Sequence, residues 1–268
     1  MSAKRLIVCG GNGFVGSRIC KYAVARGRSG EPKWGAVGPS ATPPPWARKV
    51  SWERGDVLRP ASYAPLLKGA DFVVHSLGIL LEADYKGVVS GEVSPVAGLR
   101  RLLGAAPPAA AAAAADRPTY ESMNRDSALA LAAEAAREDV SAFAYISAAS
   151  GAPGLPARYL STKREAESVI ASRFPRMRGL FLRPPFLYDS SRPVTVGMAA
   201  VTGLGAAFNG FTRGVFGGFM GAAGIKPLKV DIVAEAVVEG LGDDAVSGPL
   251  EPPEIEELAN KYWRKSML

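Results

Sequence analysis

Three glycines near the start of the chain, Gly10, Gly13 and Gly16, constrain the fold more than any other feature. They follow the apolar run 6–9, and they precede a helical pattern whose apolar face is formed by Val15, Ile19, Tyr22 and Ala23. Glycine permits a tight turn from strand to helix, and it lets a phosphate approach backbone N–H groups at a helix N-terminus. A plain turn would also need glycine, but a turn placed between a strand and an amphipathic helix predicts a dinucleotide site.

Apolar runs of strand length alternate with helical patterns along the rest of the chain. Strands are predicted at 50–54, 71–75, 143–146 and 180–183, and helices at 122–137, 161–174 and 254–264, with a strand leading into a helix over 229–241. This alternation predicts an α/β fold with a Rossmann-like doubly wound parallel sheet. We expect one NAD(P)-binding domain, 1–268, in which about 185–268 contributes a small substrate lobe.

Two segments depart from this pattern. A doubly wound fold presents a second strand within about twenty residues of the glycine turn, but residues 26–32 pass from the helix end directly into turn residues. We therefore expect the second strand to be missing or weak. Residues 103–117 are rich in proline and alanine and are interpreted as a low-complexity insertion without assigned function.

Composition excludes several classes of protein. The 32 Lys and Arg against 25 Asp and Glu give a net charge of +7, but they are scattered, so we expect no nucleic-acid binding. Cys9 and Cys20 form no zinc-type spacing, so we expect no metal and a reducing compartment.

The first strand begins so early that we expect neither a secretory signal nor a long transit peptide in this sequence. The uncharged run 194–212 is interpreted as a pocket-lining or membrane-surface segment.

Tyr159 and Lys163 stand four residues apart, on one face of a predicted helix. A neighbouring ammonium stabilises the phenolate and favours proton transfer near neutral pH, and the same lysine can reach ribose hydroxyls. Tyr-x-x-x-Lys also occurs on ordinary surface helices. Here it follows a strand that ends at Ser147, in a chain that opens with the glycine turn, which favours a catalytic pair.

Together these motifs resemble the extended and atypical short-chain dehydrogenase/reductases over nearly the whole chain. The matching pieces are the glycine turn, 55–57, 75–78, Asn124, the Tyr159–Lys163 pair and 182–185. The longer stretches 74–82 and 159–167 are most similar to the fungal mitochondrial short-chain dehydrogenase-like proteins associated with coenzyme Q (ubiquinone) biosynthesis.

The resemblance implies a role for each matched position. Tyr159 would be the general acid/base, Lys163 its partner, and Asn124 would support the lysine through a water. Pro184 would lie beside the nicotinamide, Asp56 and Val57 would meet the adenine, and Leu77 and Gly78 would pass under the riboses. The residues implied to hold the pyrophosphate are Gly10, Asn12, Gly13, Phe14, Val15 and Gly16.

This sequence differs from the family pattern at two places. The strand that reads the adenosine 2′ position is expected to be missing or weak, yet Arg28 remains with no acidic residue before it, which favours NADP(H) over NAD(H). Ala148 and Ala149 stand where active members place a catalytic serine. Either Ser147 or Ser150 substitutes for it, or the hydroxyl that polarises the substrate oxygen is absent.

Two functions follow from the resemblance. The first is an NADP(H)-dependent oxidoreductase of ubiquinone biosynthesis, with a hydrophobic quinone-like ligand and protein partners in a coenzyme Q assembly, in peripheral contact with the matrix side of the inner mitochondrial membrane. The second, favoured by the alanines after Ser147, is a catalytically silent nucleotide-binding subunit that stabilises or regulates a mitochondrial enzyme assembly. His75, the single histidine, is interpreted as structural.

Overall fold

The computed structural model describes residues 4–26, 44–79, 119–149, 156–189 and 225–267. Within these ranges a five-stranded parallel sheet has the order β1–β2–β3–β4–β7. Its strands are β1 (Leu6–Cys9), β2 (Phe72–His75), β3 (Ala142–Ile146), β4 (Arg178–Leu182) and β7 (Gly248–Leu250). The parallel sheet confirms the predicted Rossmann-like α/β fold.

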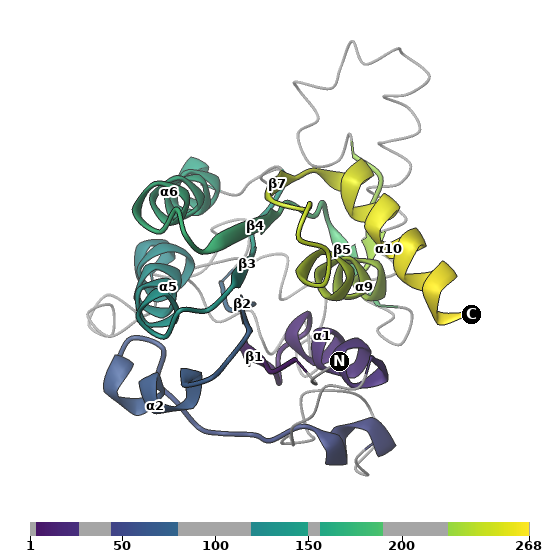
Figure 1. Ribbon diagram of the computed structural model, residues 1–268. Coiled ribbons are helices and arrows are strands. Elements are labelled where there is room, and N and C mark those ends of the chain that lie inside the picture. The colour runs from purple at the N-terminus through teal and green to yellow at the C-terminus, as the bar shows by residue number, and fades with distance from the viewer. Residues whose placement is uncertain (1–3, 27–43, 80–118, 150–155, 190–224, 268) are drawn as a thin grey trace, which may run out of the picture.

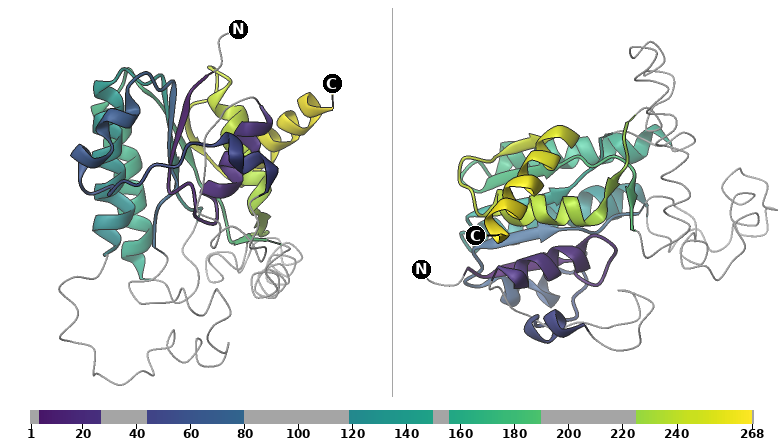
Figure 2. Two further views of the ribbon diagram at one scale, coloured as in Figure 1. Left: turned by 90° about the horizontal axis from the view of Figure 1, so that it is seen from below. Right: turned by 90° about the vertical axis from the view of Figure 1, so that its right-hand side faces the viewer.

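Helices cover both faces of the sheet, which gives three layers (Figure 1). One face carries α2 (Ala64–Leu67), α5 (Ser127–Arg137) and α6 (Ala157–Arg173); the other carries α1 (Gly16–Ala25), α9 (Val230–Leu241) and α10 (Pro252–Ser266). Figure 2 shows the same layers from two further sides. The figures agree with the doubly wound arrangement predicted from the alternation of strands and helices.

The central strands are buried on both faces, and their side chains divide between two apolar clusters. In β3, Ala142, Ala144 and Ile146 join the cluster that contains α9, whereas Phe143 and Tyr145 join the cluster with α5 and α6. This division follows from the period of two along a strand. Because both faces are covered, the strands are continuous apolar runs, which is why they were recognisable in the sequence.

The predicted strand over 50–54 is wrong. Val50 forms a single bridge, and residues 51–54 belong to no strand. A third strand in a doubly wound sheet pairs with the second strand, and the segment 27–43, where that strand is expected, lies outside the described residues. In the part of the chain that the structure describes, β1 is an edge of the main sheet.

A small apolar cluster packs on the side of α1 next to this edge. Cys20, Val24 and Val50 are buried in it, and Trp46 and Trp52 pack against them. Trp46 belongs to the short 3-10 helix η2 (Pro45–Lys49), which contacts α1. The segment 44–54 therefore covers α1 by side-chain packing instead of strand pairing.

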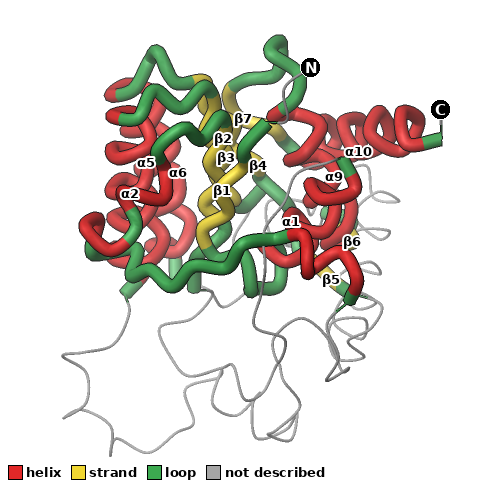
Figure 3. Tube along the Cα trace, turned by 60° about the horizontal axis from the view of Figure 1, so that its bottom comes forward, coloured by secondary structure: helices red, strands yellow, loops and turns green. Residues whose placement is uncertain are grey.

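The described residues after 185 belong to two different parts of the molecule. The strands β5 (Leu187–Tyr188) and β6 (Leu228–Lys229) pair with each other outside the main sheet, beside α9 (Figure 3). In contrast, α9, β7 and α10 complete the Rossmann core, because β7 pairs with β4 and α9 packs on the sheet. The expected substrate lobe can therefore include β5 and β6, while the uncharged run 194–212 and the insertion 103–117 lie outside the described residues.

A search of the described helices for one long and apolar enough to cross a membrane found no candidate.

Candidate functional site

The glycine turn joins β1 to α1 in a conformation that excludes larger residues. Gly10 has φ +82°, and its carbonyl accepts a hydrogen bond of 2.8 Å from the N–H of Gly13. A Cβ atom on Gly16 would lie 2.2 Å from the Gly10 carbonyl oxygen. A Cβ on Gly10 would lie 2.9 Å from Leu77 Cδ2. Glycine is therefore required at both ends of the turn.

The end of β2 is fixed against the same turn. Ser76 donates two hydrogen bonds to the carbonyl of Cys9, from its backbone N–H at 3.0 Å and from its hydroxyl at 2.7 Å. The sequence analysis did not single out Ser76. Its hydroxyl would also lie 2.6 Å from a Cβ on Gly16, so this side chain packs into the space that glycine leaves free.

The turn has the properties of an anion site. The helix α1 begins at Gly16 with no acidic residue in its first turn, so no carboxylate of that turn competes with a bound anion for its N-terminal N–H groups and positive dipole end. Asn12 is exposed, and Phe14 and Val15 are partly buried beside it. The glycines keep this turn tight and free of side chains, so that a phosphate can approach its backbone N–H groups, which fits the pyrophosphate of a dinucleotide.

Lys163 is buried, and its side chain reaches the last residue of β3. It is 4% exposed, and its Nζ donates a hydrogen bond of 2.9 Å to the carbonyl of Ile146. The ammonium lies 5.7 Å from the ring centre of Tyr159 and 5.1 Å from that of Tyr145. Burial lowers the pKa of Lys163 to about 8; the positive Arg164 also lowers it, although Glu167 opposes the shift.

Asn124 connects this lysine to the strand end of β2. It lies in the π-helix η5 (Glu121–Asp126), is fully buried, and its Oδ1 accepts a hydrogen bond of 3.0 Å from the N–H of Ile79. A Cβ on Gly78 would lie 3.0 Å from Asn124 Oδ1 and 3.5 Å from Lys163 Nζ. The structure thus brings Gly78, Asn124 and Lys163 together. π-Helical turns are frequent at functional sites, but the sequence predicted an ordinary helix here.

The structure places Ser147 in a network of charged side chains. Its hydroxyl donates a hydrogen bond to Glu167 and accepts one of 3.0 Å from Arg164. Arg164 also donates to the carbonyls of Ala148, at 2.7 Å, and Ala149, at 3.3 Å. The loop after β3 is therefore held by α6, and the Ser147 hydroxyl has its donor engaged within the protein.

The charged network extends beyond this loop. Arg183 donates to Glu167 through Nε at 3.1 Å, and its NH1 donates to Glu251 at 2.6 Å. Sequence analysis did not find Arg164, Arg183 or Glu251, because the partners are far apart in the chain. The available signals were the resemblance over 159–167, which contains Arg164 and Glu167, and the matching piece 182–185, which contains Arg183.

The remaining predicted cofactor residues have different surroundings. Pro184 is buried, and its carbonyl accepts a hydrogen bond of 2.9 Å from the N–H of Ala149. Val57 is buried in the cluster with α5, whereas Asp56 is exposed and accepts a 3.0 Å hydrogen bond from the N–H of Leu58. Arg28 and Ser150 lie outside the described residues, as do the segments that follow Ile79, Ala149 and Asp189.

His75 is buried as a neutral side chain, which agrees with its interpretation as structural. Its Nε2 lies 2.8 Å from the hydroxyl of Ser127, which itself donates to the carbonyl of Met123. Within the described ranges its Nδ1 has no hydrogen-bond partner. Burial and then the positive charge of Lys163 lower the pKa of His75 from 6.5 to about 3.

We expect His75 to make stability depend on pH. Because its folded pKa lies below its unfolded pKa, the unfolded chain takes up the proton first, and stability is lost as pH falls from 6.5 toward 3. The free energy of unfolding should lose about 2 kcal/mol from this group by pH 5. Urea unfolding of the wild type and His75→Gln at pH 7 and pH 5 measures it. An equal pH dependence in both proteins would contradict this assignment.

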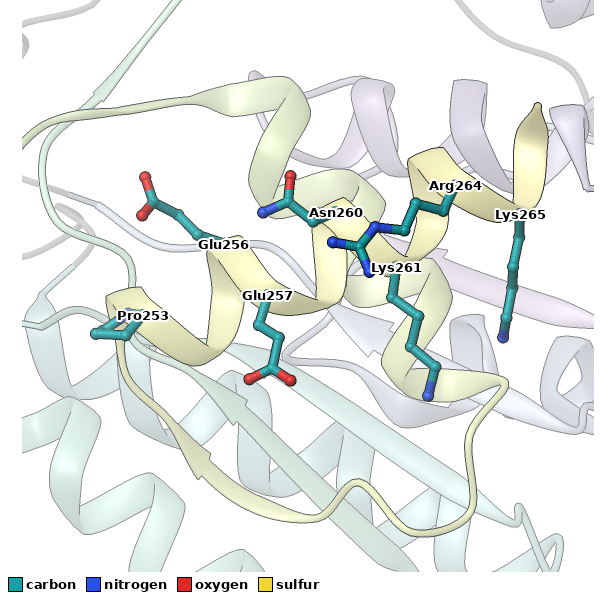
Figure 4. Close-up of a pocket in the computed structure, with 7 residues that line it drawn as sticks. All are labelled: Pro253, Glu256, Glu257, Asn260, Lys261, Arg264 and Lys265. Carbon is teal, nitrogen blue, oxygen red and sulfur yellow. The ribbon is translucent and has the colours of Figure 1, made fainter.

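Two hollows occur on the surface around α10, and neither is lined by the glycine turn or the Tyr159–Lys163 pair. Figure 4 shows the first of them, whose lining side chains are mostly charged and come from one helix. They are Pro253, Glu256, Glu257, Asn260, Lys261, Arg264 and Lys265. We assign no function to either hollow. A cluster of side chains able to hold a metal ion is not found among the residues the structure describes.

Comparison with known proteins identifies relatives by sequence and by fold. No family model matches the chain. MIOREX complex component 2 of Saccharomyces cerevisiae is 36% identical over 209 residues, which cover 70% of this chain and 74% of that protein. An uncharacterised chloroplastic protein of Arabidopsis thaliana is 26% identical, over 97% of this chain and 79% of its own length.

Solved structures share the fold at low sequence identity. UDP-N-acetylglucosamine 4-epimerase from Methanobrevibacter ruminantium matches with a TM-score of 0.56 at 16% identity, covering 94% of this chain and 76% of that one. UDP-glucose 4-epimerase of Thermus thermophilus, solved with NAD, has a TM-score of 0.54 at 16% identity, with coverage of 98% and 83%. Vestitone reductase of alfalfa (Medicago sativa) gives 0.54 at 18% identity, with coverage of 92% and 76%.

The sequence match to the yeast protein and the fold shared with epimerases and reductases agree with the motifs described above. The chain therefore belongs to the same family as MIOREX complex component 2 of Saccharomyces cerevisiae, and it shares its fold with NAD-dependent epimerases and with vestitone reductase.

Proposed function

We propose that this chain binds NADP(H) and acts as an oxidoreductase of ubiquinone biosynthesis. One observation carries the proposal: the buried Lys163 lies beside Tyr159, Asn124 and Gly78, at the same end of the parallel sheet as the glycine turn. In parallel α/β sheets this carboxyl end is where ligands bind. A dinucleotide held by the turn would therefore have its reactive end near the phenol.

Each residue has a proposed task. The N–H groups of the turn, from Gly10 to Gly16, bind the pyrophosphate, and Leu77 and Gly78 lie beneath the riboses. Lys163 binds ribose hydroxyls and stabilises the phenolate of Tyr159, which transfers the proton to or from the substrate oxygen. Asn124 positions Lys163, and Pro184 borders the nicotinamide. A bound nicotinamide dinucleotide would supply or accept the hydride.

The adenosine end is proposed to meet Asp56 and Val57, with Arg28 binding a 2′-phosphate, so that NADP(H) is preferred over NAD(H). Several solved structures with a similar fold contain NAD. This shared fold supports the binding of a nicotinamide dinucleotide, and it does not distinguish NAD(H) from NADP(H).

The cellular setting is proposed from the family resemblance and the yeast relative. The name of that relative describes a component of a complex, which supports protein partners for this chain. We propose that these partners belong to a coenzyme Q biosynthetic assembly, that the ligand is a hydrophobic quinone, and that the protein contacts the matrix side of the inner mitochondrial membrane.

A second candidate function is a nucleotide-binding subunit without turnover. It is favoured by the loop after β3, in which Ala148 and Ala149 offer no hydroxyl and Ser147 is engaged by Glu167 and Arg164. A missing oxyanion donor costs about 100-fold or more in rate in other enzymes. For Ser147 to act on a substrate it would have to leave this network.

Replacement of Tyr159 by phenylalanine distinguishes the two candidates. If the chain is an oxidoreductase, Tyr159→Phe should lower NADPH oxidation with a short-chain ubiquinone at least about 100-fold, because the proton donor is lost, while calorimetric NADPH affinity changes little. Tyr262→Phe on α10 is the control and should keep full activity. Binding of NADPH by the wild type without turnover would instead support the silent subunit.

A further inference from the structure

The proposed orientation of the dinucleotide determines where its adenosine half must lie. Gly78, Asn124 and Lys163 mark the nicotinamide side, and they surround the ends of β2 and β3. A dinucleotide bound at the glycine turn crosses the carboxyl end of β1. Its other half therefore reaches the far side of β1, which is an edge of the main sheet within the described ranges.

Trp52 stands at this edge. A Cβ on Gly11 would lie 2.9 Å from Trp52 Cζ3 and 3.3 Å from Cη2, so the six-membered ring of the indole lies against the second residue of the glycine turn. The side chain is partly buried and packs on the cluster of Cys20, Val24 and Val50. That cluster fixes the ring beside the turn.

The indole also carries a buried polar group that the described residues do not satisfy. Its Nε1 is inaccessible and has no hydrogen-bond partner within those ranges. A buried tryptophan N–H usually finds an acceptor.

We propose that Trp52 is the aromatic contact for the adenosine half of the bound dinucleotide, at the edge of β1 where a complete doubly wound sheet has its second strand. This inference rests on the proposed nucleotide binding. A base or ribose that approaches Gly11 from this side of β1 meets the indole, and aromatic contacts of this kind tolerate either form of the ribose. Trp52 therefore contributes affinity, while Arg28 is proposed to contribute the choice between NADP(H) and NAD(H).

The test uses 2′,5′-ADP, which carries the adenosine half without the nicotinamide, and ADP in a parallel titration. Tryptophan fluorescence should be quenched saturably in the wild type and in the control Trp263→Phe, whose tryptophan is exposed on α10. The quench should be lost in Trp52→Phe. In calorimetry Trp52→Ala should weaken the affinity about tenfold or more, as expected for loss of one aromatic contact to a base.

The outcomes separate this inference from the proposed function. If the folded wild type binds neither probe and also ignores NADPH, both are wrong. If it binds but Trp52→Phe keeps the quench, or folded Trp52→Ala binds as tightly as the wild type, the role of Trp52 is wrong and nucleotide binding stands. Because Trp52→Phe keeps an aromatic ring in the cluster, its result decides the matter even if Trp52→Ala does not fold.

Discussion

Gly16→Ala is expected to weaken dinucleotide binding by about 100-fold or more and to destabilise the protein. The added methyl group would lie 2.2 Å from the carbonyl oxygen of Gly10 and 2.6 Å from the hydroxyl of Ser76. The first of these is backbone and cannot rotate away, so the turn itself must shift. Misplacement of a binding group by about 1 Å can cost 100-fold in function, and overpacking typically costs 1–3 kcal/mol in stability. Calorimetry with NADPH and thermal unfolding measure the two effects.

Gly179→Ala is the matched control, because Gly179 also has no positive φ, lies near the start of β4 away from the turn, and would place its added Cβ 2.8 Å from the side chain of Phe181. It should bind NADPH almost as the wild type does. If Gly16→Ala retained wild-type affinity in a folded protein, the turn would not be the phosphate site.

Glu167→Ala should cause the largest loss of stability of any substitution considered, about 3–5 kcal/mol. The carboxylate is 5% exposed and accepts hydrogen bonds from Ser147, Arg164 and Arg183. The hydrogen bond to Glu167, with a second one to Glu251, raises the pKa of Arg183 above its usual value. Removing Glu167 leaves two partly buried guanidinium groups without their common partner and frees the loop after β3. Urea unfolding at pH 7 measures the change.

Glu165→Ala provides the control on the same helix. Glu165 is 54% exposed and pairs with Arg125 at 3.0 Å, and such surface pairs contribute about 1 kcal/mol or less. If Glu165→Ala destabilised the protein as much as Glu167→Ala, the buried network would contribute no more to the free energy of unfolding than a surface ion pair does. If Glu167→Ala were nearly neutral, the network would be a surface feature instead of a support for the loop.

The elements that the sequence predicted well are those whose signal is local. The strands at 72–75 and 142–146 are buried on both faces, so continuous apolar runs identified them. The start of α6 was predicted at 161 but lies at Ala157, because Pro156 occupies the N-cap position and Arg158 pairs with Glu121 on η5. That pairing joins two segments that are far apart in the sequence.

The features that could not be predicted depend on distant partners. Residues 50–54 have a strand pattern, but only Val50 forms a bridge, and its side chain packs against Cys20 and Val24 of α1. The π-helix at Asn124 has no sequence pattern of its own. Ser147 was considered as a catalytic hydroxyl because of its position after β3, whereas its contact with Glu167 depends on how α6 packs across that loop.

The central claim is that the glycine turn holds a nicotinamide dinucleotide, and side-by-side calorimetric titration of the folded wild-type protein with NADPH and NADH tests it most directly. The account predicts saturable binding of NADPH with weaker binding of NADH. Preference for NADH would contradict the role of Arg28. The absence of binding of either nucleotide at millimolar concentration, by protein shown to be folded, would contradict the claim itself.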